Sequence, residues 1–113
     1  RIARHGSLYI SPETSGSLKN KFRIDIEKQI YGLDKSPIDS QCSCHTCKNY
    51  SRSELRKFYK TMHQDKQNIE AKALYGKLAS IHNIHFMLNL TSQIREAIKT
   101  NSFDKLKNYW LKE

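Results

Sequence analysis

The sequence predicts a small α+β unit, in which two or three short strands are followed by three or four helices. Its 113 residues are enough for one domain and too few for two. Residues 1–41 lack helical periodicity, whereas apolar residues recur at helical spacing from residue 51 onward. We therefore expect 1–113 to form a single unit, with strands and loops at 1–41, a cysteine-containing site at 42–82 and closing helices at 84–113.

Two segments in the first third of the chain are typical of strands. Residues 7–11, SLYIS, are rich in residues that favour strands, and a turn containing proline and glycine follows at 12–16. Residues 22–26, FRIDI, alternate apolar and polar side chains, as a half-buried strand does. A loop at 32–40, which contains Pro37, then leads into the cysteines.

The first helix is predicted to begin after Ser51. Ser51 and Glu54, three positions later, match the pattern of a capping box. Four apolar residues then share one helical face, at spacing i, i+3, i+4 and i+7: Leu55, Phe58, Tyr59 and Met62. We expect this face to enter the core, and we expect the polar stretch 63–68 to be a loop between helices.

Three more helices are expected in the rest of the chain. The second is predicted at 69–82, the third at 84–98, and Ser102 is expected to cap a last short helix. The aromatic residues are more economically explained as core than as platforms for stacked bases. The residues expected to be the apolar positions of these helices are Ala73, Leu74, Leu78, Ile81, Ile84, Leu88, Ile94, Ala97, Ile98, Phe103, Leu106, Tyr109 and Trp110.

Composition points to a partner of opposite charge. The formal net charge is +9 and the pI is about 9.6, which favours a polyanion, nucleic acid first and an anionic membrane surface second. A well-solvated basic surface without a particular partner is the alternative. No apolar run approaches the ~20 residues of a membrane span, and no signal-peptide pattern is present, so we expect a soluble, cytoplasmic protein. A chain that starts at Arg1 and not at Met is expected to be a fragment or a processed piece.

All three cysteines, Cys42, Cys44 and Cys47, lie within six residues. An odd, clustered set argues against a disulfide framework and for a reducing compartment. Such thiolates suit a zinc ion, which binds four nitrogen or sulfur ligands in a tetrahedron. An iron–sulfur cluster would normally need a fourth cysteine, which this chain lacks. Three buried, reduced thiols are the alternative, but packing gives no reason for them to crowd at this spacing.

A fourth ligand would have to be a histidine. His5 lies too far from the cysteine pattern, and the short tether of His45 would strain its ring away from a shared ion. His63 lies on the expected loop and could be an ordinary solvated side chain. His82 and His85 are three positions apart on one helical face, so spacing alone leaves both open.

The motif CSCHTCKNYSR at 42–52, followed by IHNI at 81–84, resembles the zinc signature of tRNA-guanine transglycosylase, also called queuine tRNA-ribosyltransferase. In that family a downstream His-Asn pair completes a C-x-C-x-x-C motif, which implies His82 as the fourth zinc ligand. RIARHGS at 1–7, Pro37–Asp39 and IREAI at 94–98 resemble further family segments in the same order. The resemblance covers all 113 residues but only the C-terminal part of the family's chain. It leans toward the eukaryotic catalytic subunit, although the loops look several residues longer than the family pattern.

The resemblance implies a parent enzyme with an irregular (β/α)8 barrel. Members of the family exchange guanine at the tRNA wobble position for queuine or a related 7-deazaguanine, through a covalent aspartyl-RNA intermediate. No aspartate of this chain matches the nucleophile or the acid/base residue, so the chain alone is expected to be inactive. The family also implies a homo- or heterodimer. The segment that matches its binding site for the tRNA anticodon loop consists of Arg1, Ile2, Ala3 and Arg4.

Two other functions are compatible with the sequence. One is a free-standing, zinc-stabilised RNA-binding module without chemistry, and the other is the silent subunit of the heterodimeric enzyme. Lys48 and Arg52 flank the cysteines and could contact phosphates, or could be a solvated helix start. In each case we expect a structural zinc, because four protein ligands leave no open position for water.

Overall fold

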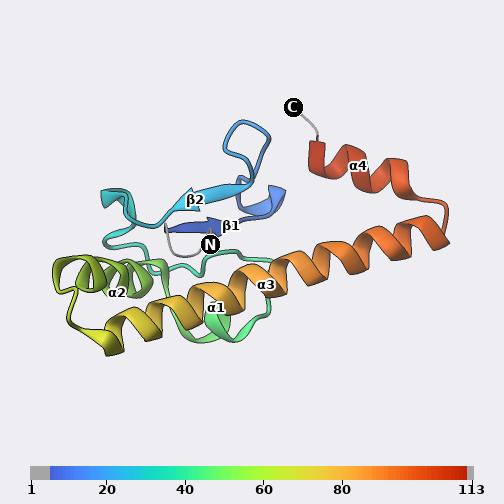
Figure 1. The fold of residues 1–113 in the computed structure, drawn as a ribbon. Coiled ribbons are helices and arrows are strands. Elements are labelled where there is room, and N and C mark those ends of the chain that lie inside the picture. The colour runs from blue at the N-terminus through green and yellow to red at the C-terminus, as the bar shows by residue number, and fades with distance from the viewer. Residues whose placement is uncertain (1–5, 112–113) are drawn as a thin grey trace.

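In the computed structural model, which describes residues 6–111, a two-stranded sheet and four helices form an elongated body of 51 × 23 × 22 Å. Figure 1 shows the sheet over one face of the long helix α3, with α2 beside the first turns of α3 and α4 near its far end. The predicted order of short strands followed by helices is confirmed. The elements are β1 (Ser7–Tyr9), β2 (Arg23–Asp25), α1 (His45–Asn49), α2 (Arg52–Gln64), α3 (Ile69–Lys99) and α4 (Phe103–Leu111), with short 3-10 helices at Pro12–Thr14 and Gln29–Tyr31.

β1 and β2 form an antiparallel hairpin, with Leu8 opposite Ile24. The backbone N–H of Ile10 donates to the carbonyl of Phe22, and this bond extends the ladder by one residue. At the start of β1, Gly6 has a φ of +78°, and a Cβ there would lie 3.2 Å from the ring of Tyr59. Glycine is therefore required both by the left-handed backbone and by the close approach to α2.

The cysteine motif contains a helix that the sequence did not predict. α1 spans only five residues, and its N-cap is Cys44, whose Sγ accepts a hydrogen bond from the backbone N–H of Cys47 at 3.4 Å. α2 then begins as predicted. Ser51 Oγ accepts from the N–H of Glu54 at 3.2 Å, and Glu54 Oε1 accepts from the N–H of Ser51 at 2.9 Å, so the capping box is confirmed.

The prediction of two helices at 69–82 and 84–98 is wrong, because α3 is one continuous helix of 31 residues. Asn68 caps it, since its Oδ1 accepts from the N–H of Ala71 at 3.0 Å. No glycine or proline lies near the expected break at residue 83 to interrupt the backbone hydrogen bonds. The helix ends at Lys99 with Thr100 as its C-cap, and Asn101, the next residue, has a φ of +57°, a left-handed conformation that asparagine tolerates.

The buried face of α3 also differs from the predicted one. Ala73 and Leu74 are exposed, and the core-facing stripe instead begins at Tyr75. Ile84, Leu88 and Ile98 are 60–66% exposed, so they are not core residues in this structure. The difference arises because α2, α1 and β1 all contact one side of α3, at Tyr75, Leu78 and His82 respectively. The buried residues of α3 are Tyr75, Leu78, Ala79, His82, Asn83, Phe86 and Ala97.

α4 begins immediately after Ser102, as predicted, and returns toward the hairpin (Figure 1). The Trp110 ring lies 5.4 Å from that of Phe22 and 5.8 Å from that of Phe86, measured between centroids. Tyr109 donates from its hydroxyl to Glu13 at 3.0 Å. Among residues 6–111, no helix combines the length and the apolar character required to cross a bilayer.

Candidate metal centre

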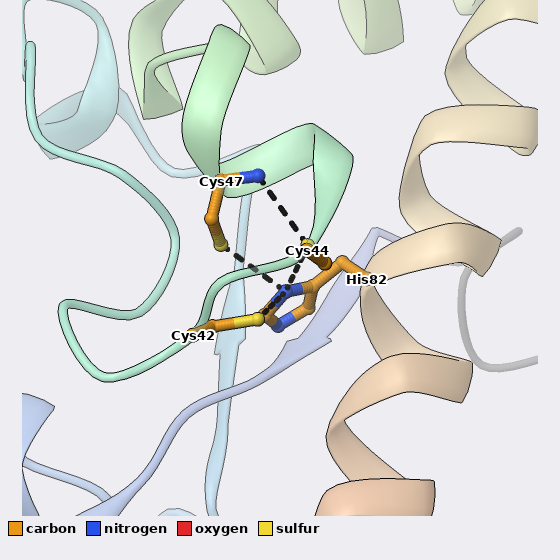
Figure 2. Close-up of side chains that lie close together, drawn as sticks. All are labelled: Cys42, Cys44, Cys47 and His82. Carbon is orange, nitrogen blue, oxygen red and sulfur yellow. Dashed lines mark hydrogen bonds between the residues drawn. The ribbon is translucent and has the colours of Figure 1, made fainter.

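The three cysteines and His82 converge between α1, the loop before it, and α3 (Figure 2). The Nδ1 atom of His82 lies 3.5 Å from Sγ of Cys42, 3.6 Å from Sγ of Cys44 and 3.3 Å from Sγ of Cys47. All four potential ligand atoms lie within 4.8 Å of one another. The chain thus brings donors separated by 35 to 40 positions into one small volume.

These distances fit a tetrahedral site. Zn–S near 2.3 Å and Zn–N near 2.0–2.1 Å would separate sulfur and nitrogen by about 3.6 Å. Cys44 and His82 are buried, and Cys42 and Cys47 are half-buried. Within residues 6–111 this is the one group of three or more Cys, His, Asp and Glu residues with metal-binding geometry. The predicted Cys3His group, able to bind one metal ion, is confirmed.

The other described histidines lie outside this group. His45 points away to Asn49, whose Nδ2 lies 3.3 Å from its Nδ1. His63 packs against Tyr59, with ring centroids 4.4 Å apart. His85, which shares a helical face with His82 by spacing, is only half-buried and is not one of the four converging residues. The structure therefore selects His82 from the two candidates that spacing left open.

A hydrogen bond of the second ring nitrogen of His82 fixes the orientation of the imidazole. Nε2 donates to the backbone carbonyl of Tyr9, 2.7 Å away in β1. A carbonyl can only accept, so a proton lies on Nε2 and Nδ1 is the ring nitrogen that faces the three sulfur atoms, where its lone pair would bind a metal ion. A partner of this kind is typical of metal-binding histidines.

Asn83, the next residue, holds the same strand. Its Nδ2 donates to the carbonyl of Ser7 at 3.1 Å, and its Oδ1 accepts from the N–H of Tyr9 at 3.1 Å. The side-chain amide thus pairs with β1 as a neighbouring strand would. The sequence contained the His-Asn pair, but no local signal reveals that the asparagine binds a strand 74 positions away.

The cysteine loop is attached to α3 independently of the thiols. Thr46, which is completely buried, donates from Oγ1 to the carbonyl of Leu78 at 2.6 Å. Leu78 lies one helical turn before His82, so this bond places α1 next to the imidazole. The sequence gives no sign of this bond, because one threonine between two cysteines carries no distinctive pattern.

Asp39 organises the loop that leads into the cysteines. Its buried carboxylate accepts from the N–H and the hydroxyl of Ser11 at 2.8 and 2.9 Å, from the hydroxyl of Thr14 at 2.7 Å and from the N–H of Gln41 at 3.0 Å. A buried carboxylate with this many donors is fully satisfied. Asp39 is therefore a structural loop residue.

Arg52 is also committed to the loop. Its Nε donates to the carbonyl of Pro37 at 3.1 Å, its Nη2 donates to the carbonyl of Ile38 at 2.8 Å, and its Nη1 lies 3.3 Å from Oδ2 of Asp34. The guanidinium also lies over the ring of Tyr31. These contacts use the side chain to hold the loop before α1, whereas Lys48 is exposed.

The four side chains of the group shift one another's pKa values. A hydrogen bond from the Cys47 thiol lowers the pKa of Cys42 to about 4. The same bond, with burial, raises the pKa of Cys47 far above its usual range. Burial lowers the pKa of His82, but its hydrogen bonds to Cys42 and Cys44 outweigh this and raise that pKa to about 9. Without a metal, the Cys42 thiolate is therefore stabilised by protons on Cys47 and His82, and a bound metal ion would replace these protons.

The predicted RNA-binding residues Arg1, Ile2, Ala3 and Arg4 lie outside the residues that the structure describes. The described chain begins at Gly6, directly before β1. Their role therefore stays a prediction.

Comparison with known proteins identifies the family. The profile described as queuine tRNA-ribosyltransferase matches residues 1–113. A protein of Archaeoglobus fulgidus, provisionally named queuine tRNA-ribosyltransferase, is 43% identical over 111 residues, 98% of this chain and 25% of the relative. The queuine tRNA-ribosyltransferases of Thermosipho africanus and Bacillus velezensis are 36% and 37% identical, over 99% and 88% of this chain and 26% and 21% of their own. The chain spans about a quarter of the length of these relatives, and it belongs to the queuine tRNA-ribosyltransferase family.

Proposed function

We propose that this chain is the C-terminal zinc-binding part of a tRNA-guanine transglycosylase. The parent enzyme would exchange guanine at the wobble position of tRNA for queuine or a related 7-deazaguanine. The observation that carries the proposal is the convergence of Cys42, Cys44 and Cys47 on Nδ1 of His82, in a chain of this family. We infer that the nucleophilic and acid/base aspartates of the family lie outside this chain, so the chemistry would belong to the rest of the parent.

Zinc is the ion that this donor set favours. Three thiolates and one imidazole match the soft and borderline ligands of structural zinc sites, and their spacing suits a tetrahedron. Four protein ligands would leave no position for water or substrate. The ion would therefore stabilise the fold and take no part in the base exchange.

In the parent enzyme, this chain would hold the segment that recognises tRNA. Residues 1–4 match the family's RNA-binding segment, and their two arginines suit that role because a guanidinium binds phosphate bidentately and stacks on unpaired bases. This segment directly precedes β1, whose outer edge is bound by His82 and Asn83. We infer that the metal group fixes the strand from which the RNA-binding segment extends.

The parent is proposed to be a cytoplasmic homo- or heterodimer with a (β/α)8 barrel, and to be the catalytic subunit. A silent subunit with the same metal group, or a zinc-stabilised RNA-binding module, would differ in one respect. Only the catalytic subunit would have an aspartate a few residues upstream of Arg1. Sequencing of the region upstream of Arg1 would distinguish them.

Metal analysis and two matched histidine variants test the zinc site. Protein purified without added zinc should contain close to one zinc per chain, and His82→Ala should lower zinc content and affinity steeply. His85→Ala, on the same helix, should leave both nearly unchanged. A folded, metal-free wild-type protein, or the reverse ranking of the two variants, would refute the ligand assignment.

Activity tests the rest of the proposal. The full-length parent should incorporate labelled guanine into a tRNA with guanine at the wobble position. It should not label a tRNA in which that base is replaced. A full-length protein that binds zinc but incorporates no base would support the silent subunit instead.

A further inference from the structure

We propose that a cavity between the hairpin, α3 and α4 binds a small aromatic carboxylate, an inference that does not depend on the proposed function. The cavity has a volume of about 320 Å³, which lies within the size range of small-molecule sites. It is found where α4 and the loop between β1 and β2 lie on the same side of α3 (Figure 1). The aromatic residues that line it are Tyr9, Phe22, Phe86, Phe103 and Trp110.

The wall of this cavity suits a flat aromatic ring. The rings of Phe22 and Phe86 lie 5.4 and 5.8 Å from that of Trp110, measured between centroids. Tyr9 stacks on Phe86 at 5.4 Å. Phe103 is 44% exposed, so a bound ring would cover apolar surface that water now contacts. An aromatic ligand would therefore gain edge-to-face and offset contacts with rings that are already in place.

Two lysines give the cavity a positive rim. Lys21, in the hairpin loop, and Lys107, on α4, line the cavity but are exposed, so their stems contact the apolar wall and their ammonium groups reach solvent. Neither ammonium group is paired within residues 6–111, where the single ion pair joins Arg52 to Asp34. No acidic residue is among the described residues that line the cavity. The rim therefore favours an anionic group on the ligand.

The indole of Trp110 lacks a hydrogen-bond partner. Its Nε1 is buried, and it donates to no acceptor in the described part of the chain. A buried indole N–H normally has an acceptor, because an unpaired donor in the interior is unfavourable. A carboxylate oxygen that reached Nε1 after a small shift of the ring would supply the missing acceptor.

The hairpin loop holds an unfavourable backbone conformation at the cavity. Lys21 and Phe22 are consecutive residues with φ of +57° and +56°, a left-handed conformation that residues with large side chains rarely adopt. Asn20 maintains it, because its Oδ1 accepts from the N–H groups of Ser17 and Phe22 at 2.9 and 3.0 Å. Backbone strain of this kind is typical of segments whose side chains contact a ligand.

The cavity suits a small molecule better than a membrane surface. Membrane-binding surfaces project apolar side chains outward beside a larger set of cations. Here the aromatic rings surround a hollow, and the described residues that line it include two lysines and no arginine. A bicyclic ring with one carboxylate matches this size and this charge.

The test uses two ligands that have the same ring system and differ in charge. Naphthalene-2-carboxylate is the anionic probe, and naphthalene-2-carboxamide is its neutral match. Isothermal titration calorimetry of the full-length, zinc-bound protein measures both. The carboxylate should bind at one site per chain and more tightly than the amide. Added salt should weaken binding of the carboxylate alone, because it screens the two ammonium groups.

Two double variants that remove the same charge locate the site. Lys21→Gln with Lys107→Gln should weaken binding of the carboxylate about fivefold and leave the amide unchanged. Lys99→Gln with Lys105→Gln, at exposed positions outside the cavity, should change neither affinity. Trp110→Phe keeps an aromatic ring but removes the N–H, so it should weaken both ligands.

No saturable binding of either ligand, equal weakening by both lysine pairs, or wild-type affinity in the cavity variant would overturn the inference. The lysine variants change exposed side chains, so they decide the question even if Trp110→Phe proves unstable in thermal melts. Phosphatidylserine vesicles distinguish the remaining source of an anionic group. Vesicle binding that depends on Lys21 and Lys107, without binding of the free carboxylate, would assign the rim to a membrane and would also overturn the inference.

Discussion

The two halves of α3 are parts of one helix but are held in different ways. From Tyr75 to Phe86 the helix contacts α2, α1 and the hairpin, and its buried face includes the polar residues His82 and Asn83. Beyond Phe86 it buries only Ala97 among the described residues. The apolar residues Leu88 and Ile98 there are 66% and 64% exposed.

This difference separates two sources of order. The position of the first half is fixed by hydrogen bonds and potential metal ligands that join it to distant segments. Each of these contacts requires a defined geometry. The second half is helical because backbone hydrogen bonding continues from the first half up to the residues that end the helix. Changes in the first half should therefore unfold the molecule, and equivalent changes in the second should have little effect on stability.

Removal of the metal should give the largest effect. A strong chelator at neutral pH should abolish the order of β1, α1 and the first half of α3, because about 10 kcal/mol or more of metal-binding free energy is coupled to folding in small zinc domains. Acid should act in the same direction, since protons compete for the thiolates and the imidazole. Circular dichroism and hydrogen exchange measure this. Unchanged helix content and melting temperature with zinc demonstrably removed would contradict it.

A pair of leucines on α3 compares the halves directly. Leu78→Ala removes a side chain that is 2% exposed and should cost about 3 kcal/mol of unfolding free energy. Leu88→Ala alters a side chain that is 66% exposed and should change stability by less than about 0.5 kcal/mol. Urea denaturation of the zinc-bound protein gives both values. Equal costs would mean that the second half is as tightly packed as the first.

A pair of asparagines isolates the polar contacts from apolar packing. Asn83→Ala leaves the carbonyl of Ser7 and the N–H of Tyr9 without their partner, and should cost about 2 kcal/mol. Asn89→Ala, at an exposed position of the same helix, should be close to neutral. Thermal melts that show no difference between the two variants would refute the role assigned to Asn83.

The capping box of α2 should give the smallest effect. Ser51→Ala removes the acceptor for the N–H of Glu54 and should cost about 1 kcal/mol. Ser51→Asp keeps an acceptor at the same position and should restore most of the loss. A cost near that of Leu78→Ala would show that the cap also supports the adjacent cysteine loop.

The features that sequence predicted were those with local signals. The capping box of Ser51 and Glu54 lies within four residues, and the cysteine motif needs only one partner from elsewhere. The resemblance to the family supplied that partner, His82, where spacing left His85 equally open. Close packing of thiols and imidazole then followed from the requirements of a shared ion.

The features that sequence missed depend on contacts between distant segments. The face that α3 buries is decided by where the hairpin and α1 contact it, so apolar periodicity alone misplaced Leu74. The apolar pattern changes face near Asn83 and so suggested a break between two helices, although no glycine or proline there interrupts the backbone hydrogen bonds. α1 was missed because its N-cap is a cysteine sulfur, which is not among the usual capping groups.

The hydrogen bonds at β1 have a consequence for self-association. In this hairpin Leu8 faces the partner strand, so the backbone groups of Ser7 and Tyr9 point to the opposite edge. Side chains of His82 and Asn83 occupy that edge, where an unpaired strand could otherwise recruit another chain. Loss of an ion bound by Nδ1 of His82 would free this imidazole to leave the carbonyl of Tyr9. The metal group would therefore also block the addition of a strand from another chain at this edge, and we expect the metal-free protein to aggregate through β1.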